Sequence, residues 1–188
     1  RDSPALASIR RCDTWQQLGH PILLLLTTDN IHLHLDLFAG LPTETPHSFA
    51  MAFSGLHALQ PHYLQLGFLK ILPGSLLAAE AEERGLLYSD YPPYQVLATP
   101  TMPAEYLFAL SAADKAPTGF TNTGRFRQTL RLAASRCPGG PLTFILALGR
   151  PWTSAGWAGL PFPVKQPCRQ RQCLHLTHPW FFAPPRLD

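Results

Sequence analysis

Imidazole and carboxylate side chains alternate with apolar residues over residues 31–38. The polar members of this segment are His32, His34 and Asp36. An alternation with a period of two predicts a β-strand, so the three side chains share one face of it. In a closed barrel one such face looks into the interior, and barrel sites gather at the carboxyl ends of the strands. We therefore expect His34 and Asp36, nearest that end, to line a cofactor or substrate cavity; the alternative is a polar row facing solvent on an edge strand.

Two residues of the following turn, Gly40 and Glu44, extend this set of candidates. Gly40 permits a tight turn and leaves room for a ligand to approach the backbone. Glu44 could form a hydrogen bond with a ligand or with a backbone donor of the turn; the alternative is an acidic residue favoured near a helix N-terminus by the helix dipole. Gln65 lies within a second apolar segment and needs a hydrogen-bond partner if it is buried. An interior position would give it a ligand or water, and an outward position would leave it a packing anomaly.

A separate group of metal-ligand types stands near the C-terminus in the spacing Cys-x4-Cys-x-His-x2-His: Cys168, Cys173, His175 and His178. Thiolate and imidazole are the ligands that zinc prefers. The spacing is compressed relative to ordinary zinc fingers, with no long loop between the pairs, so we assign no metal ligand and keep a small zinc-supported domain as an alternative. The sequence shows no Ser/His/Asp constellation, phosphate-binding loop or carboxylate pair.

The elements that would position these residues follow a regular order. We predict a strand over 31–38, a helix over 46–60 with Thr45 as N-cap and Pro46 at its first position, a strand over 63–71, and a short helix over 76–84 closed by Gly85. Strand, helix, strand, helix is the order of βαβ units with parallel strands. The sequence therefore predicts an α/β sheet or barrel segment over about 31–85.

The flanking regions are predicted to be mainly helical. Before the first strand we expect a helix followed by a turn over residues 4–18 and an apolar helix or buried segment over 15–27. After Gly85 we expect a loop over 88–94, an extended piece over 96–99 and helices over 103–115 and 124–135, followed by a compact apolar run at 142–148. Beyond 150, tryptophans and prolines show no clear period. We divide the chain into domains 1–85 and 86–188, the second poorly defined after 150.

Composition excludes several classes of protein. The chain has 188 residues, of which 46% are hydrophobic and 14% charged, which suits a globular protein with a sizeable core. A net charge of +3 with scattered arginines gives no basis for nucleic-acid binding. The most apolar stretch, 21–26, is far short of the roughly 20 residues that span a bilayer. Four sparse, irregular cysteines indicate a reducing cytoplasm, and Arg1 in place of a methionine suggests a start upstream.

Three segments in the right order resemble one enzyme family. Residues 30–44, which contain Gly40-Leu-Pro-Thr-Glu44, resemble the fifth strand and following turn of the radical S-adenosylmethionine barrel, where a strand ends in Gly-x-Pro-x-Glu. Residues 59–75 resemble the sixth strand in a bacterial subgroup that joins an N-terminal cobalamin-binding domain to this barrel. Residues 88–100 resemble the start of the subgroup's C-terminal domain, and 122–126 and the apolar run near Phe144 fit its middle. The resemblance covers about residues 4–150 and is strongest over 30–100.

The resemblance implies the last βα units of a partial (β/α) barrel followed by a mainly helical accessory domain. It implies a full-length enzyme with a [4Fe-4S] cluster, S-adenosylmethionine and cobalamin, acting on a small molecule or peptide by methylation or other radical chemistry. His34, Asp36, Gly40, Glu44 and Gln65 would contribute to the cofactor and substrate pocket. The family's Cys-x3-Cys-x2-Cys motif, whose thiolates hold the cluster, is absent, so we expect this chain to be inactive alone. A non-catalytic interaction module is the other alternative.

Overall fold

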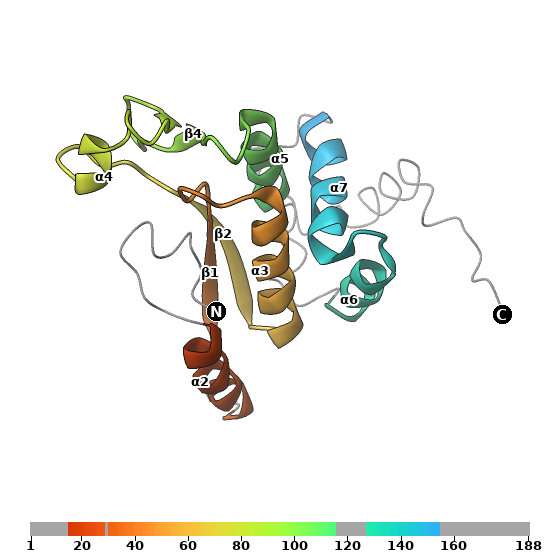
Figure 1. The fold of residues 1–188 in the computed structure, drawn as a ribbon. Helices are drawn as coiled ribbons and strands as arrows, with labels where there is room; N and C mark the ends of the chain where they lie inside the picture. Colours follow the sequence, from red (N-terminus) through yellow and green to blue (C-terminus); the bar gives the residue numbers. More distant parts are fainter. Residues whose placement is uncertain (1–14, 29, 116–126, 155–188) are drawn as a thin grey trace. The chain divides into compact units, whose positions relative to one another are not determined.

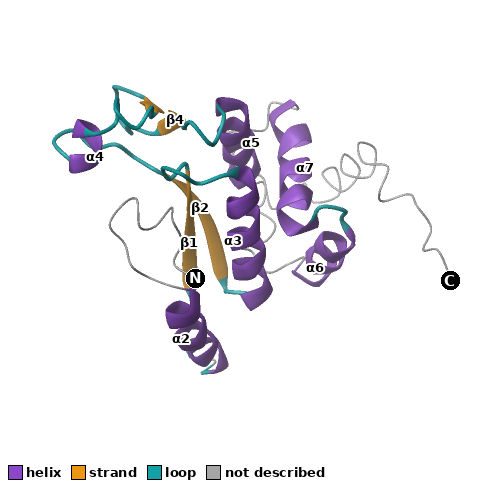
Figure 2. Ribbon diagram, viewed as in Figure 1, coloured by secondary structure: helices purple, strands orange, loops and turns teal. Residues whose placement is uncertain are grey.

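A computed structural model describes residues 15–28, 30–115 and 127–154 of the chain (Figures 1 and 2). The chain divides into two compact units, Arg1–Ser111 and Ala112–Asp188, and each is described by itself. The described residues form a mixed α/β fold with helices and a few short strands. The expected domain boundary at residue 86 stays a prediction.

The centre of the first unit is a βαβ arrangement. It consists of β1 (His34–Ala39), α3 (Pro46–Leu59) and β2 (Tyr63–Phe68). The two strands pair in parallel, and α3 connects them and lies beside them (Figure 1). The parallel strand–helix–strand order predicted from the sequence is thus present, although β1 begins three residues later and β2 ends three residues earlier than expected. Two parallel strands do not by themselves make a barrel.

Local sequence signals set both ends of α3. The Thr45 hydroxyl accepts a hydrogen bond from the Ser48 backbone N–H at 3.1 Å, and the Ser48 hydroxyl accepts one from the Thr45 backbone N–H at 2.9 Å. This reciprocal capping satisfies N–H groups that have no partner within the helix, and Pro46 occupies the first helical position, which needs no N–H donor. Gln60 ends the helix in the left-handed region at φ 57°, and Pro61 follows it. The predicted helix is confirmed.

The apolar faces of these elements form the core of the first unit. Phe49 and Phe53 of α3 are buried, as are Ala39 of β1 and Leu66 of β2. Side chains alternate across the strands, so the leucine-bearing face turns toward the core and the intervening residues face away. Full burial of one phenylalanine side chain contributes roughly 1.5–3 kcal/mol to the free energy of folding. Burial of Phe49 and Phe53 therefore favours packing of α3 on the leucine-bearing face of the sheet.

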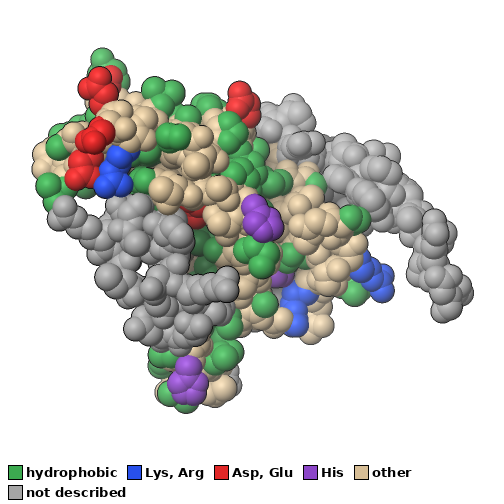
Figure 3. Space-filling view, in the orientation of Figure 1, with side chains coloured by type: hydrophobic (Ala, Val, Ile, Leu, Met, Phe, Trp, Pro, Cys, Tyr) green, Lys and Arg blue, Asp and Glu red, His purple; other side chains and the backbone are tan. Residues whose placement is uncertain are grey.

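The chain after β2 remains part of the first unit. It forms α4 (Leu76–Ala79), β3 (Leu87–Tyr88) and β4 (Val96–Ala98) before α5 (Ala104–Lys115) begins. The Val96 N–H donates to the Leu69 carbonyl at 2.9 Å, and the Ile71 N–H donates to the Tyr94 carbonyl at 2.8 Å. These bonds attach residues 94–96 to the segment that leaves β2. Figure 3 shows acidic side chains and a basic one gathered over α4 and the turn after it.

The second unit contains α6 (Arg127–Arg136), α7 (Gly140–Ser154) and the last residues of α5. Its buried residues include Leu142, Ile145 and Leu148, so the apolar run at 142–148 is the buried face of a helix. A Cβ on Gly149 would lie 2.7 Å from the Ala113 Cα. Such close approach of α7 to the end of α5 requires glycine at that position.

The segment before β1 forms α2 (Trp15–Thr27). Of the two predicted alternatives, a helix and a buried segment, the helix is observed. Leu23 and Leu24 are exposed, the latter by 61%. The predicted helix over 4–18 lies mostly outside the described residues. Within the described ranges, no helix combines the length and apolar character needed to cross a membrane.

Candidate functional site

The face of the β1–β2 sheet that turns away from the core carries three registered pairs of residues. Parallel partners in register project to the same side of a sheet. The pairs on this side, which we call the open face, are His34 with Tyr63, Asp36 with Gln65, and Phe38 with Gly67. Asp36 and Gln65 are both exposed. The structure therefore brings together the carboxylate and the amide that the sequence placed on separate segments.

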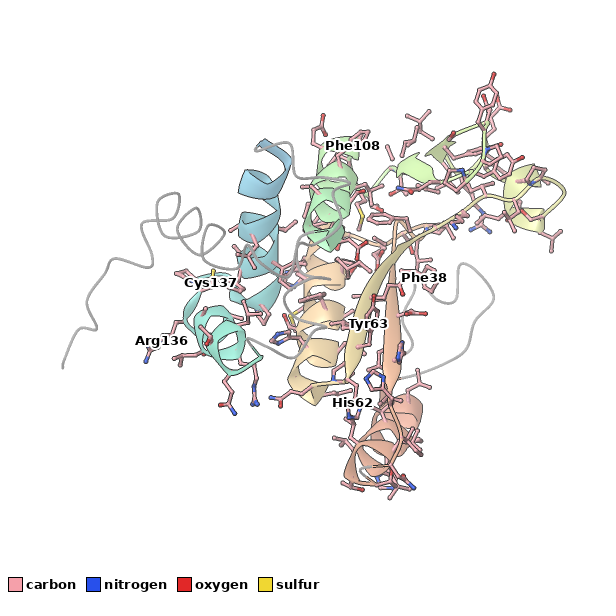
Figure 4. The ribbon with its side chains drawn as sticks, turned by 180° about the vertical axis from the view of Figure 1, so that it is seen from behind. Phe38, His62, Tyr63, Phe108, Arg136 and Cys137 are labelled. Carbon is pink, nitrogen blue, oxygen red and sulfur yellow. The ribbon has the colours of Figure 1, made fainter. Side chains whose placement is uncertain are left out.

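His34 lies at the amino end of the open face, because β1 begins with it. The sequence pattern placed His34 nearer the carboxyl end, since the strand was expected to start at residue 31. The His34 ring stacks on Tyr63 with centroids 4.9 Å apart, and its Nε2 is 2.8 Å from the His32 Nδ1. Figure 4 shows Tyr63 and His62 toward this end of the strands and Phe38 toward the other. A role for His34 in the cofactor cavity stays a prediction.

Phe38 is a residue of the open face that sequence reasoning did not single out. Its side chain is 49% exposed, and a Cβ built on Gly67 would lie 2.7 Å from its ring. The space left by the missing side chain of Gly67 is therefore filled by the Phe38 ring. The signal was present in the sequence, because Phe38 continues the alternation of the polar residues and is the first apolar member of that row.

Gly40 is required by the backbone at the carboxyl end of β1. Its φ is +85°, and a Cβ there would lie 3.4 Å from Val96 and 3.7 Å from Leu107. The left-handed conformation favours glycine, and the space beside it is occupied by side chains from β4 and α5. The close approach expected at Gly40 is therefore made by the protein itself.

Glu44 is buried in the turn between β1 and α3, where 5% of it is exposed. Burial raises the pKa of its carboxyl from 4.5 to about 7, against the opposing effect of hydrogen bonds from the Leu41 and Gly40 N–H groups. Among the described residues no partner reaches its Oε2. The backbone carbonyl of Glu44 accepts from the Thr101 hydroxyl at 2.6 Å. The negative charge of Glu44 also raises the pKa of Tyr106, after the larger effect of burial.

The five predicted site residues thus occupy two environments: His34, Asp36 and Gln65 on the open face, and Gly40 and Glu44 in the buried turn at its carboxyl end. The exposed pair consists of a carboxylate, which can accept hydrogen bonds from a polar ligand, and an amide, which can both donate and accept them. The buried acid titrates near neutral pH, the property that general acid–base chemistry requires.

Other groups with ligand chemistry contribute little to this site. No set of three His, Cys, Asp or Glu side chains in the described ranges is arranged to hold a metal ion. Burial raises the pKa of the Cys137 thiol in the α6–α7 turn, which lowers its thiolate fraction at neutral pH. The Cys-x4-Cys-x-His-x2-His group lies outside the described residues, so the zinc-supported alternative stays a prediction.

Part of the chain matches a known protein family. Residues 82–163 match a family model described as a protein of unknown function, DUF4080. This domain is known as a C-terminal part of cobalamin-binding radical S-adenosylmethionine proteins. No significant match was found among curated proteins. The matched region begins after β2, so it does not include the open face.

Proposed function

We propose that this chain forms part of the pocket wall of a cobalamin-dependent radical S-adenosylmethionine enzyme and is inactive by itself. The observation that carries the proposal is the open face: two parallel strands in register, covered on one side by α3 and bearing Asp36 and Gln65 on the other. In a (β/α) barrel the helices lie outside and the uncovered face looks inward. The DUF4080 match over residues 82–163 supports the same assignment from an independent part of the chain.

The residues present suit one cofactor of such an enzyme better than another. S-adenosylmethionine carries amino, hydroxyl and sulfonium groups, which an exposed carboxylate and amide can bind. An iron–sulfur cluster needs thiolates, and the family's three-cysteine motif does not occur in the sequence. We therefore assign Asp36 and Gln65 to the binding of S-adenosylmethionine or substrate, and the cluster and cobalamin to other parts of the enzyme.

Gly40 and Glu44 would close the carboxyl end of the same pocket. The turn packs against Val96 and Thr101, so it is held by residues within the DUF4080 match. Among the described residues, Glu44 Oε2 is the one buried side-chain nitrogen or oxygen for which no hydrogen-bond partner is found, and a bound molecule at the turn would supply one. The accessory domain would then act by positioning this turn.

The test begins with the product of the complete reading frame, purified without oxygen. Iron, sulfide and corrinoid are quantified, and visible absorption reports an iron–sulfur chromophore. We expect stoichiometric cluster and corrinoid and cleavage of S-adenosylmethionine under reduction. A colourless, iron-free protein would overturn the proposal.

The contribution of the open face is tested in that protein with Asp36→Asn and Gln65→Leu. Each should weaken binding of S-adenosylmethionine or substrate by about ten-fold or more, the loss expected for a hydrogen bond to a charged group, while iron content stays unchanged. Asp90→Asn is the matched control, because Asp90 is an exposed loop carboxylate. Equal affinities of the Asp36 and Asp90 variants would remove the open face from the pocket.

A further inference from the structure

Three histidines and a tyrosine gather at the amino ends of β1 and β2. His32 Nδ1 lies 2.8 Å from His34 Nε2. The His32 ring is also 4.9 Å from the ring of His62, and the His34 ring stacks on Tyr63. Figure 4 places His62 and Tyr63 at this end. The cluster shares His34 and Tyr63 with the open face. It lies at the amino end of β1, away from the turn at Gly40, and it uses neither Asp36 nor Gln65, the residues assigned above to ligand binding.

We propose that His32 and His34 form a two-nitrogen binding site for a tetragonal divalent transition-metal ion, Cu²⁺ or Ni²⁺. A metal held at about 2.0–2.1 Å from each of two nitrogens separates them by about 2.9 Å at a 90° angle and about 3.3 Å at a tetrahedral angle. The observed separation of 2.8 Å is that of a hydrogen bond between the two rings. It is also close to the right-angle separation, so turning both rings toward a common point would present the two nitrogens to one ion. Right angles between nitrogen ligands are typical of square-planar or tetragonal Cu²⁺ and Ni²⁺.

The two nitrogens can accept a metal without net loss of protons from neutral rings. At 2.8 Å one nitrogen of the pair donates a hydrogen to the other. When a metal binds, that hydrogen moves through solvent to the other nitrogen of the same imidazole, and both facing nitrogens present lone pairs. Protonated rings must first lose their protons, so acid competes with the metal.

His62 supports the pair and is not a third ligand. Its Nδ1 accepts a hydrogen bond from the Leu33 backbone N–H at 3.1 Å. A neutral imidazole that accepts at Nδ1 carries its hydrogen at Nε2, so neither nitrogen of His62 is available to a metal while this bond persists. The ring packs against His32 and limits its rotation.

The remaining coordination positions are left to water. The described residues offer no group of three His, Cys, Asp or Glu side chains for one ion, and both His32 and His34 are exposed. A site with two protein ligands and open positions binds exchangeably. The inference does not depend on the proposed function, because it uses only the amino ends of the strands.

The test uses the full chain in a background that removes the other imidazole and thiol groups of the C-terminal segment: Cys168→Ser, Cys173→Ser, His175→Gln and His178→Gln. Ni²⁺ is titrated by calorimetry, and Cu²⁺ is added for electron paramagnetic resonance. We expect one Ni²⁺ site, and a Cu²⁺ signal split by two imidazole nitrogens. No saturable site, or splitting by a single nitrogen, would overturn the proposal.

Single substitutions identify the ligands. His32→Gln and His34→Gln should each weaken Ni²⁺ binding by about a hundred-fold, because a single remaining imidazole binds the ion without the gain in affinity that two linked ligands provide. His47→Gln, at an exposed position of α3, is the control and should leave affinity unchanged. His62→Gln should weaken Ni²⁺ binding by about ten-fold, the low end for a residue that supports a ligand; a loss as large as that of His34→Gln would refute the two-ligand assignment. Circular dichroism verifies the fold of each variant.

Discussion

Replacing Glu44 with glutamine should remove a pH-dependent loss of stability from the first unit. The carboxyl is 5% exposed, and its pKa is raised from 4.5 to about 7, chiefly by burial. The folded protein therefore binds the Glu44 proton more tightly than the unfolded chain does. Protonation favours folding, so this contribution is fully present below pH 4.5 and is lost as the pH rises to about 7.

The magnitude follows from the size of the pKa change. Each unit corresponds to about 1.4 kcal/mol, so a change from 4.5 to about 7 represents about 3 kcal/mol in the free energy of unfolding. Glutamine has the shape of the protonated acid, and its oxygen can still accept from the Gly40 and Leu41 N–H groups. Glu44→Gln should therefore be close to wild type at low pH and about 3 kcal/mol more stable above pH 8.

Urea unfolding followed by circular dichroism measures this difference at intervals from about pH 4 to pH 9. Glu105→Gln is the matched control, because Glu105 is an exposed carboxylate on α5. Histidines contribute their own pH dependence, but they are common to all three proteins and cancel in the comparison. Tyr106 gives a second readout: its pKa, raised by burial and then by the charge of Glu44, should fall in Glu44→Gln but not in the control.

Parallel stability curves for wild type and Glu44→Gln would refute the reasoning. They would mean that the Glu44 carboxyl has an ordinary pKa in the folded protein and is reached by water. A variant that is less stable than wild type above pH 8 would equally contradict it, because it would show that the ionised carboxylate stabilises the turn.

Further predictions concern the glycines and the strand edge. Gly40→Ala should lower the free energy of unfolding by about 2–3 kcal/mol, because the φ of Gly40 is +85° and a Cβ there would lie 3.4 Å from Val96. Gly74→Ala should lower it by only about 1 kcal/mol, because Gly74 has a φ of +78° but no neighbour within 4 Å of its Cβ. Equal losses for the two variants in urea unfolding would show that crowding at Gly40 has no effect. Gly67→Ala should destabilise wild type by about 1 kcal/mol but not the Phe38→Ala variant, whereas additive effects would contradict the contact. The open edge of β1 should make the isolated chain associate, and a monodisperse, cooperatively melting sample would show otherwise.

The central fold could be predicted because its signals are local. Leucines at every second residue indicated β1. The start of α3 is set by Thr45 and Pro46 and its end by Pro61, all of which lie within or directly beside the helix. The parallel pairing of the strands followed from the predicted order of strand, helix and strand. The start of β1 was less well defined, because the alternation extends through Ile31 and His32 although strand pairing begins at His34. A periodic pattern reports which residues share a face, but not where a partner strand begins.

The environment of Glu44 could not be predicted, because it depends on residues distant in the sequence. The Thr101 hydroxyl bonds the Glu44 carbonyl across 57 positions, and Tyr106 bonds the Pro46 carbonyl across 60. The turn residues alone left a ligand contact and a favourable helix-end charge as equal alternatives. The contact of Phe38 with Gly67 has the same origin, since it exists only in the observed register of the two strands.

The sheet itself gives a physical reason to look beyond these two strands. In the part of the chain that the structure describes, β1 and β2 have each other as their only strand partners. Two strands bury little on their own and expose hydrogen-bonding groups along both outer edges. One face is already covered by α3, and the other combines an exposed aromatic ring with an acid and an amide. Adding strands at the edges would pair the backbone, curve the sheet away from α3 and enclose Phe38, Asp36 and Gln65 together. A pocket wall would account for the unpaired strand edges, the exposed aromatic ring and the two polar residues together. A solvent-facing edge strand would account only for the polar residues.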